Sequence, residues 1–385
     1  MNRNRPISKR EQPPKKKSRH SHYGYWRQTI HLLWKPGHWP TRILVLLTAS
    51  VILFVSASYG IASWYISKHA DEPLKYGTTF VPRYARYYGL EPKATMQALI
   101  DDVGFKRFRL VSYWDDIEST QGIYNFEELD WQFRMAEQKG VEVNLALGLR
   151  QPRWPECHMP DWAEKLPKDQ WYPQLKTFMG SVIERYKDSP ALISYQVENE
   201  FFMNIFGECT DFDRSRLVDE YNFVKALDPS KPIIITRSNN WGGVPLYAPT
   251  PDQFGVAVYK RVWDKTLTKR YFEYPYPSWF YSSLAGAGEI VSGKDMIIHE
   301  LQMESWLTEE GDFEMNSVAS IPEQNKTMNA KRLKDRFEYA NKTGIRTIDT
   351  WGAEWWYWRK VKGNDPSLWN VAKEEVAKAE ASNNR

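Results

Sequence analysis

Two patterns of apolar and polar positions alternate along most of the chain after residue 75. Short apolar runs rich in β-forming residues favour strands, whereas longer stretches with apolar residues three or four positions apart favour helices. Eight strands are predicted, at Thr78–Pro82, Arg107–Ser112, Val141–Leu149, Leu192–Val197, Ile233–Thr236, Gly255–Tyr259, Met296–His299 and Arg346–Trp351. Helices are predicted between most of them, at Thr95–Val103, Phe126–Lys139, Trp171–Tyr186, Asp213–Leu227, Lys331–Asn341 and Ser367–Ala381.

This alternation predicts the fold class. Strands that alternate with helices indicate a parallel sheet. Eight such units favour an α/β fold with a closed (β/α)8 TIM barrel over an open, doubly wound sheet. The first strand runs directly into Tyr84 without a glycine-rich loop, which counts against dinucleotide binding. We therefore expect one barrel domain over residues 76–385 and no organic cofactor.

A different pattern precedes the barrel. Residues 43–66 carry no charge, and a run of 24 residues is long enough to cross a hydrocarbon core. Arg42 and Lys68 bound the run, and Trp64 and Tyr65 lie where interfacial aromatic residues are expected. We expect a transmembrane signal anchor at 43–66, followed by a linker at 67–75. A cleaved signal peptide, with Ser56–Ser58 as its cleavage site, and a buried core helix remain the alternatives.

The charge is unevenly distributed. Residues 1–42 contain eleven Lys and Arg residues and one acid, Glu11, so the other residues have 41 basic against 47 acidic side chains. By the positive-inside rule, this basic and disordered arm places the N-terminus in the cytoplasm and the barrel outside a cell membrane that the chain crosses once. Nucleic-acid binding by the arm is the alternative, and we do not expect it.

The chain has two cysteines, Cys157 and Cys209, both in segments predicted as loops after neighbouring strands. An oxidising exterior would permit a disulfide between them, and two free thiols are the alternative.

Acidic side chains follow two of the predicted strands. In a TIM barrel, functional groups gather at the carboxyl ends of the strands. The fourth strand runs into Glu198-Asn199-Glu200, and the seventh ends at Glu300. Glycoside cleavage needs two such groups, one to protonate the departing oxygen and one to attack the sugar or activate water. We predict Glu200 and Glu300 as this pair, with Glu198 as a competitor that would face the same side of an extended strand.

The segment Val197–Glu200 resembles the Asn-Glu motif of the clan of retaining (β/α)8 glycoside hydrolases, which includes β-galactosidases, cellulases, mannanases and xylanases. The segments Arg109–Trp114 and Gly122–Phe126 are similar to the region these enzymes carry before their second helix. The resemblance covers about residues 78–358. It implies that Glu200 is the acid/base and that Glu300, in Ile298–Gln302, is the nucleophile of a β-glycosidase. Phe201 follows Glu200 where many members have Pro, which resembles the β-galactosidase-like branch.

The resemblance also implies several carbohydrate contacts. Arg109 would lie near the nucleophile, Tyr259 would hydrogen-bond to it, and Trp351 would be a platform for the sugar. Asn199 could hydrogen-bond to the sugar 2-hydroxyl. The remaining candidate contacts to carbohydrate are Trp114, Trp154, Gln302, Glu304, Trp306, Trp355 and Trp356.

His299 beside Glu300 does not indicate a metal site, because neighbouring side chains on a strand point to opposite faces. The sequence has no HExxH motif or Cys cluster either, so we expect no metal. The sequence as a whole predicts a membrane-anchored retaining β-glycoside hydrolase whose partner is a carbohydrate. A transglycosylase with the same residues and a non-catalytic carbohydrate-binding barrel are the alternatives.

Overall fold

The computed structural model describes residues 39–203, 206–209, 211–238, 249–265, 267–308 and 310–383. The chain forms two compact units, Met1–Ala57 and Ser58–Arg385. Most of the predicted basic arm at 1–42 lies outside the described residues. Within it, Trp39–Arg42 are already helical.

Eight parallel strands close into a barrel in the order β1-β10-β9-β6-β5-β4-β3-β2. The eight predicted strands are all present, so the predicted (β/α)8 barrel is confirmed. The strands are β1 Lys75–Phe80, β2 Arg107–Val111, β3 Glu142–Leu147, β4 Leu192–Val197, β5 Ile233–Ser238, β6 Gln253–Val258, β9 Met296–Gln302 and β10 Thr347–Trp351.

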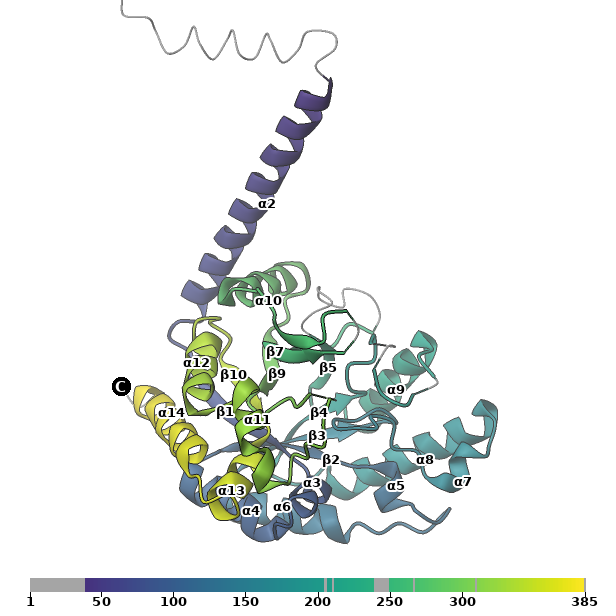
Figure 1. Cartoon of the computed structure of the whole chain (residues 1–385). Coiled ribbons are helices and arrows are strands. Elements are labelled where there is room, and N and C mark those ends of the chain that lie inside the picture. Colours follow the sequence, from purple (N-terminus) through teal and green to yellow (C-terminus); the bar gives the residue numbers. More distant parts are fainter. Residues whose placement is uncertain are drawn as a thin grey trace, which may run out of the picture. The chain divides into compact units, whose positions relative to one another are not determined.

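Helices surround the barrel (Figure 1). The six predicted helices correspond to α4 Pro92–Ala98 with the π-helical turn Leu99–Val103, α6 Glu127–Lys139, α8 Lys168–Tyr186, α9 Arg214–Leu227, α12 Ala330–Asn341 and α14 Ser367–Asn383. Further helices are α3 Pro82–Tyr87, α5 Trp114–Ile117, α7 Asp161–Glu164, α10 Ser278–Ser292, α11 Ile321–Thr327 and α13 Ala353–Val361.

An antiparallel hairpin of β7 Arg261–Asp264 and β8 Arg270–Glu273 interrupts the alternation between β6 and β9. The hairpin and α10 were not predicted. The strands of the hairpin are only four residues long, and α10 carries Gly and Ala at its centre, so neither has a strong apolar period. The hairpin lies immediately after β6, where its side chains can reach the functional end of the barrel.

A buried ionic cluster occupies the barrel interior. Asp349 on β10 accepts from Arg107 Nε at 2.9 Å and pairs with His299 Nδ1 at 2.7 Å. Burial alone would raise the pKa of Asp349, but Arg107 and His299 hold that pKa at about 2. Burial, with Arg109 nearby, lowers the pKa of His299 to about 4. These groups are structural parts of the barrel.

The long apolar helix α2 spans Trp39–Lys68 and contains an 18-residue stretch with a mean hydropathy of 2.1, so it is long and apolar enough to cross a membrane. It begins four residues before the predicted segment. Its last three turns, in the unit that begins at Ser58, pack against α10, and Ala62 and Tyr65 are buried there. Ile61 and Tyr65 lie against Gly286 of α10 and Ile66 lies against Gly344, so this part of the predicted membrane segment contacts the barrel.

Several polar contacts fix this junction. Tyr65 Oη donates to Asp295 Oδ1 at 2.9 Å, and His69 Nε2 lies 2.9 Å from Glu289 Oε2. Arg346 Nε donates to the carbonyl of His69 at 2.6 Å. The residues between α2 and β1, which were predicted as a linker, are thus bonded to the barrel.

Candidate active site

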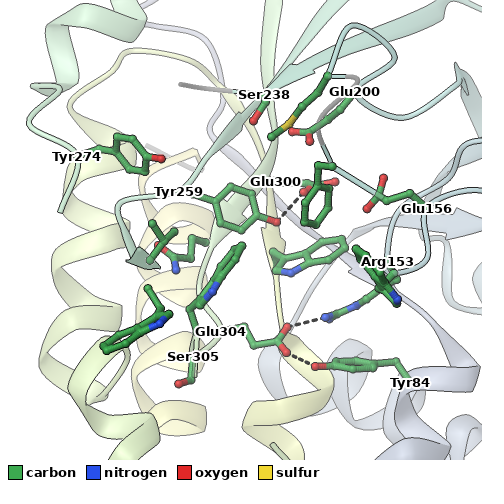
Figure 2. A pocket seen from close by; sticks show the side chains of 18 residues that line it. Tyr84, Arg153, Glu156, Glu200, Ser238, Tyr259, Tyr274, Glu300, Glu304 and Ser305 are labelled. Carbon is green, nitrogen blue, oxygen red and sulfur yellow. Dashed lines mark hydrogen bonds and ion pairs between the residues drawn. The ribbon is translucent and has the colours of Figure 1, made fainter. Parts of the chain in front are cut away.

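A cleft of about 500 Å³ opens at the carboxyl ends of the strands. Its walls come from the ends of β5, β9 and β10, from the segments after β1, β3, β4, β6 and β9, and from the β7–β8 hairpin with the residue that follows it. Figure 2 shows the side chains that line it. They are Tyr84, Arg153, Trp154, Glu156, Glu200, Met203, Phe206, Ser238, Tyr259, Val262, Trp263, Tyr274, Glu300, Gln302, Glu304, Ser305, Trp306 and Trp351.

Both oxygens of Glu300 accept hydrogen bonds. Arg109 Nη2 donates to Oε1 at 2.6 Å, and Tyr259 Oη donates to Oε2 at 2.8 Å, the bond that Figure 2 marks. Arg109 reaches Glu300 from β2 through the barrel interior, and its Nη1 also donates to the carbonyl of His299 at 3.1 Å. This arrangement suits an ionised carboxylate, whose oxygens only accept.

Glu200 has a contrasting environment. Its backbone N–H donates to Thr236 Oγ1 at 2.8 Å, which fixes the residue where β4 has ended. Within the described residues, its buried Oε1 has no hydrogen-bond partner. Burial raises the pKa of Glu200 well above the usual range, and the nearby carboxyls of Glu300 and Glu156 raise it further. The geometry therefore favours the protonated form of Glu200.

Glu198 does not share the cleft with Glu200, which corrects the expectation that the two would face the same side. Both residues adopt positive φ, 56° at Glu198 and 42° at Glu200, so the alternation of an extended strand no longer holds. The Glu198 carboxylate accepts from Arg216 Nη1 at 2.8 Å and from the backbone N–H of Leu149 at 2.7 Å. Glu198 thus anchors α9 and the loop after β3.

Asn199 is buried between the two glutamates. Gln196 Nε2 donates to its Oδ1 at 2.9 Å, and its own Nδ2 donates to Glu156 Oε2 at 3.0 Å. The orientation of its amide is therefore set by the protein. Asn199 lies behind the surface of the cleft, and the contact to a sugar hydroxyl remains a prediction.

Three of the predicted tryptophans line the cleft. Trp154 is 60% exposed and lies 5.8 Å from the ring of Phe206, and Trp306 is edge-on to Tyr259 at 6.0 Å. Trp351 is 9% exposed, and the guanidinium of Arg153 lies 4.1 Å from its ring centroid. Arg153 covers part of Trp351, so the open aromatic surfaces are those of Trp154 and Trp306.

The other three tryptophans are buried away from the cleft. The Nε1 of Trp114 donates to Glu118 at 2.7 Å, that of Trp355 to Gln324 at 3.0 Å, and that of Trp356 to the Met303 carbonyl at 2.7 Å. All three rings are fully buried, and all three indole N–H groups are satisfied by the protein. The structure does not support these three as platforms for a sugar.

Gln302 and Glu304 line the cleft, but their polar atoms already have protein partners. Gln302 Oε1 accepts from the backbone N–H groups of Lys260 and Arg261, at 2.8 and 2.9 Å. Glu304 forms an ion pair with Arg153, with Nη1 2.8 Å from Oε2, and accepts from the hydroxyl of Tyr84, as Figure 2 shows. Gln302 holds the start of the β7–β8 hairpin, and Glu304 joins three loops at one end of the cleft.

Glu156 is a third carboxyl of the cleft and was not predicted. It is 4% exposed, and Figure 2 shows its carboxyl turned toward Glu200 and Glu300. Burial raises the pKa of Glu156 to about 8, Arg150 opposes the rise, and Glu300 adds to it. The sequence signal was weak, because Glu156 lies nine residues after β3 and not at its end.

A disulfide joins Cys157 to Cys209 across a sequence separation of 52 residues. It links the loop after β3 to the loop after β4, directly beside Glu156. Within the described part of the chain, no three His, Cys, Asp or Glu side chains gather in a group that could hold a metal ion.

No family model matches the chain. Among curated proteins, it is 27% identical over 164 residues to the β-galactosidase BgaB of Geobacillus sp. (strain Y412MC61), a match that covers 36% of this chain and 24% of that protein. It is 23% identical over 154 residues to the β-galactosidase Bga of Halorubrum lacusprofundi, covering 34% and 22% of the two chains. The matched region thus spans about a quarter of each relative.

Solved structures share the fold. The polyextremophilic β-galactosidase from Halorubrum lacusprofundi has a TM-score of 0.54 at 11% identity, covering 80% of this chain and 58% of that one. GH5_18 from Streptomyces cattleya, solved in complex with GlcNAc, has a TM-score of 0.54 at 10% identity, with 80% of each chain covered. The barrel therefore has the fold found in these proteins.

Proposed function

We propose that the protein is a retaining β-glycoside hydrolase in which Glu300 is the nucleophile and Glu200 is the acid/base. The observation that carries this proposal is the contrast between two carboxyls in one cleft. Glu300 accepts hydrogen bonds from Arg109 and Tyr259, whereas burial raises the pKa of Glu200 well above its usual range. One carboxylate and one carboxylic acid at neutral pH are what glycoside cleavage requires.

In the first step, a carboxylate oxygen of Glu300 attacks the anomeric carbon as the bond from this carbon to the leaving oxygen breaks. Glu200 gives its proton to that leaving oxygen, so the aglycone departs as an alcohol. The product is a glycosyl ester of Glu300. The position of Glu200 is fixed by its backbone bond to Thr236, which keeps the acid within the cleft.

In the second step, the ionised Glu200 takes a proton from a water molecule whose oxygen attacks the same carbon. The bond to Glu300 breaks, its carboxylate is restored, and Glu200 is protonated again. Two inversions give net retention of configuration. If a sugar hydroxyl took the place of water, the same residues would carry out transglycosylation.

The partial similarity to two β-galactosidases supports a carbohydrate substrate with a β-linkage. Trp154 and Trp306 support sugar binding as well, because their exposed rings can stack on the apolar face of a sugar. The proposal also includes Arg109, Tyr259 and Trp351 as residues that hold the nucleophile or border the sugar.

We also propose that α2 anchors the barrel at a cell membrane that the chain crosses once. The helix is long and apolar enough to cross, and eleven basic residues precede or begin it. The positive-inside rule then places residues 1–38 in the cytoplasm and the cleft outside. Substrate would be a poly- or oligosaccharide at the cell surface.

Azide rescue tests the two roles. Glu200→Ala should lower kcat by about 10²- to 10⁴-fold, and azide should restore turnover and give a glycosyl azide of retained configuration. Glu300→Ala should leave background activity, and azide should give the inverted product.

Glu118→Gln is the control. Glu118 is a buried glutamate that directly follows α5 and lies outside the cleft, so this variant shows what the loss of a buried carboxylate does to activity when the site is intact. Near-normal turnover of Glu300→Ala would refute the assignment of the nucleophile. A wild-type protein that binds but never cleaves would favour a carbohydrate-binding barrel.

A further inference from the structure

The side chains at one end of the cleft form an interlocked cluster, the end cluster, of Tyr84, Tyr88, Arg153, Glu304 and Glu354. Glu304 pairs with Arg153 and accepts from the hydroxyl of Tyr84, as Figure 2 marks. The buried Tyr88 donates to the same carboxylate at 3.3 Å, and Arg153 Nη2 lies 3.8 Å from Glu354 Oε2. Because removing one partner from a buried ion pair is strongly unfavourable, a ligand that enters the cleft will not displace these side chains easily.

The end cluster is also packed tightly. The guanidinium of Arg153 lies between two rings, 3.5 Å from the centroid of Tyr84 and 4.1 Å from that of Trp351. The turn after β10 presses on Glu304, since a Cβ at Gly352, whose φ is 109°, would collide with the Glu304 side chain. The segments after β1, β3, β9 and β10 thus build a wall across the cleft together.

The order of the strands shows which end of the cleft this wall closes. In the barrel, β1 and β10 lie opposite β5 and β4. Tyr84 follows β1 and Trp351 ends β10, so the wall stands on their side. Glu200 follows β4, and because it protonates the leaving oxygen in the proposed mechanism, the leaving group lies toward β4 and β5. The sugar that Glu300 attacks then lies on the other side, between Glu300 and the wall (Figure 2).

The space between Glu300 and the wall is short. Arg109, which donates to Glu300 at 2.6 Å, has its guanidinium 5.7 Å from the centroid of Trp351. Arg153 of the wall contacts the same indole ring at 4.1 Å. One tryptophan side chain therefore spans the distance from the partner of the nucleophile to the wall. A pyranose ring is about as broad as an indole, so this space suits one sugar.

We propose that the end cluster closes the cleft beyond a single sugar, so that the protein removes one sugar at a time from the non-reducing end of a β-linked chain. The proposal rests on the proposed glycosidase function. A second sugar on the far side of the attacked one would have to displace Tyr84 or Arg153, and with Arg153 the charge that neutralises Glu304. The rest of the substrate chain would extend past Glu200 toward the ends of β4 and β5.

Two substrates test the closed end: the 4-nitrophenyl β-glycoside that the wild-type protein cleaves fastest in a panel of common hexosides, and the 4-nitrophenyl glycoside of the β-1,4-linked disaccharide of the same sugar. Nitrophenol release gives the rate, and mass spectrometry identifies the free sugar. We expect kcat/KM for direct release of the intact disaccharide to be about a hundredfold or more below that for release of the monosaccharide.

Tyr84→Ala should open the wall, because Tyr84 is half-buried and the ring stacked on it, Tyr87, is exposed. We expect the gap between the two substrates to narrow about tenfold or more in this variant. Tyr84→Phe is the matched control, since it loses the hydroxyl but keeps the ring, and it should keep the gap of the wild-type protein whatever its absolute rate.

Thermal unfolding checks that each variant is folded. If Tyr84→Ala does not fold, the products that the wild-type protein forms from the disaccharide glycoside decide the matter. Free disaccharide released by wild type as fast as the monosaccharide, or a gap that is the same in a folded Tyr84→Ala, would overturn the closed end while leaving the glycosidase intact. A wild-type protein that cleaves no glycoside in the panel would remove the proposed function, and the closed end with it.

Discussion

Glu198 and Glu200 lie two residues apart, yet their carboxyls have different surroundings. Arg216 neutralises Glu198 outside the cleft, whereas Glu200 has two further carboxyls near it inside the cleft. The positive φ at both positions turns the chain between them. At the scale of the residue, the chemistry of a carboxyl follows from which groups its backbone brings close.

His158 gives a prediction for pH dependence. Its ring stacks on Tyr113 at 3.6 Å, and burial, with Arg83 nearby, lowers its pKa to about 3. The folded state keeps His158 neutral, while the unfolded state takes up a proton below pH ~6.5. The free energy of unfolding should therefore fall as pH falls from ~6.5 toward 3, by up to about 1.4 kcal/mol per pH unit for this group.

Chemical denaturation of His158→Phe between pH 7 and pH 4.5 measures this contribution. The variant keeps an aromatic ring but cannot titrate, so its stability should fall less steeply than that of wild type over this range. His299, whose pKa burial also lowers, titrates in both proteins and leaves a residual slope. Identical slopes would show that His158 does not carry the effect.

Sequence could predict residues whose position along a strand determines their role. Glu200 and Glu300 follow apolar runs, and Arg109 lies within one, so the barrel places them. The sequence could not show that Trp306 lines the cleft whereas Trp356 is buried away from it. The identity of a tryptophan does not reveal which side of a loop or helix its ring occupies. Glu156 was missed because its place depends on a loop clamped by a disulfide and by Gly207.

At the scale of elements, loops and strand ends share the site, because the loop after β3 supplies Glu156 and the loop after β4 supplies Glu200, whereas Glu300 lies on β9 itself. The strands were predicted because buried parallel strands have continuous apolar runs. The β7–β8 hairpin supplies Val262 and Trp263 to the cleft but has no period that distinguishes it from a loop. Insertions of this kind vary the cleft without changing the barrel.

The packing of α2 on α10 is a second feature that only the structure shows. A Cβ at Gly286 would lie 2.8 Å from Ile61 Cγ2 and 3.2 Å from the Ile61 carbonyl, so glycine permits the close approach. Gly286→Leu should overpack this contact and lower the free energy of unfolding by about 1–3 kcal/mol. Thermal unfolding of the full chain in detergent measures the change.

Gly60→Leu is the matched control. It makes the same substitution one residue away from Ile61, in α2, but nothing lies within 4 Å of its Cβ. It should leave the unfolding temperature unchanged or raise it, since Leu favours a helix more than Gly does. Equal destabilisation by both variants would contradict the packing of residues 58–68 on α10.

At the scale of the whole molecule, the predicted membrane segment is divided between two compact units. Residues up to Ala57 belong to one compact unit, and the residues from Ser58 belong to the barrel unit. A chain that starts at Ser58 should therefore be folded and released from membranes, whereas one that starts at Leu74 should unfold at a lower temperature. It would lose the bond from Tyr65 to Asp295 and the contact of His69 with Glu289.

Fractionation of cells and thermal unfolding check these two outcomes. The full chain should sediment with membranes and resist extraction by high salt, as a spanning helix implies. A Ser58 chain that remains on membranes would contradict anchoring by the preceding residues. Equal unfolding temperatures of the two shortened chains would show that residues 58–73 add nothing to the stability of the barrel.

The eight strands of the barrel were predictable, because eight apolar runs separated by helices leave few arrangements. The division of the chain into two units could not be predicted from the sequence. The apolar run is uninterrupted, so it gives no sign that the last three turns of α2 pack against α10.

Trapping of the glycosyl-enzyme intermediate tests the central claim most directly. The wild-type protein would be incubated with aryl 2-deoxy-2-fluoro-β-glycosides, digested, and analysed by mass spectrometry for a peptide that carries the fluorosugar. The account predicts a single ester-linked sugar on Glu300, within Met296–Gln302. A label on Glu200 or Glu156, or inverted configuration of the product with no label, would contradict it.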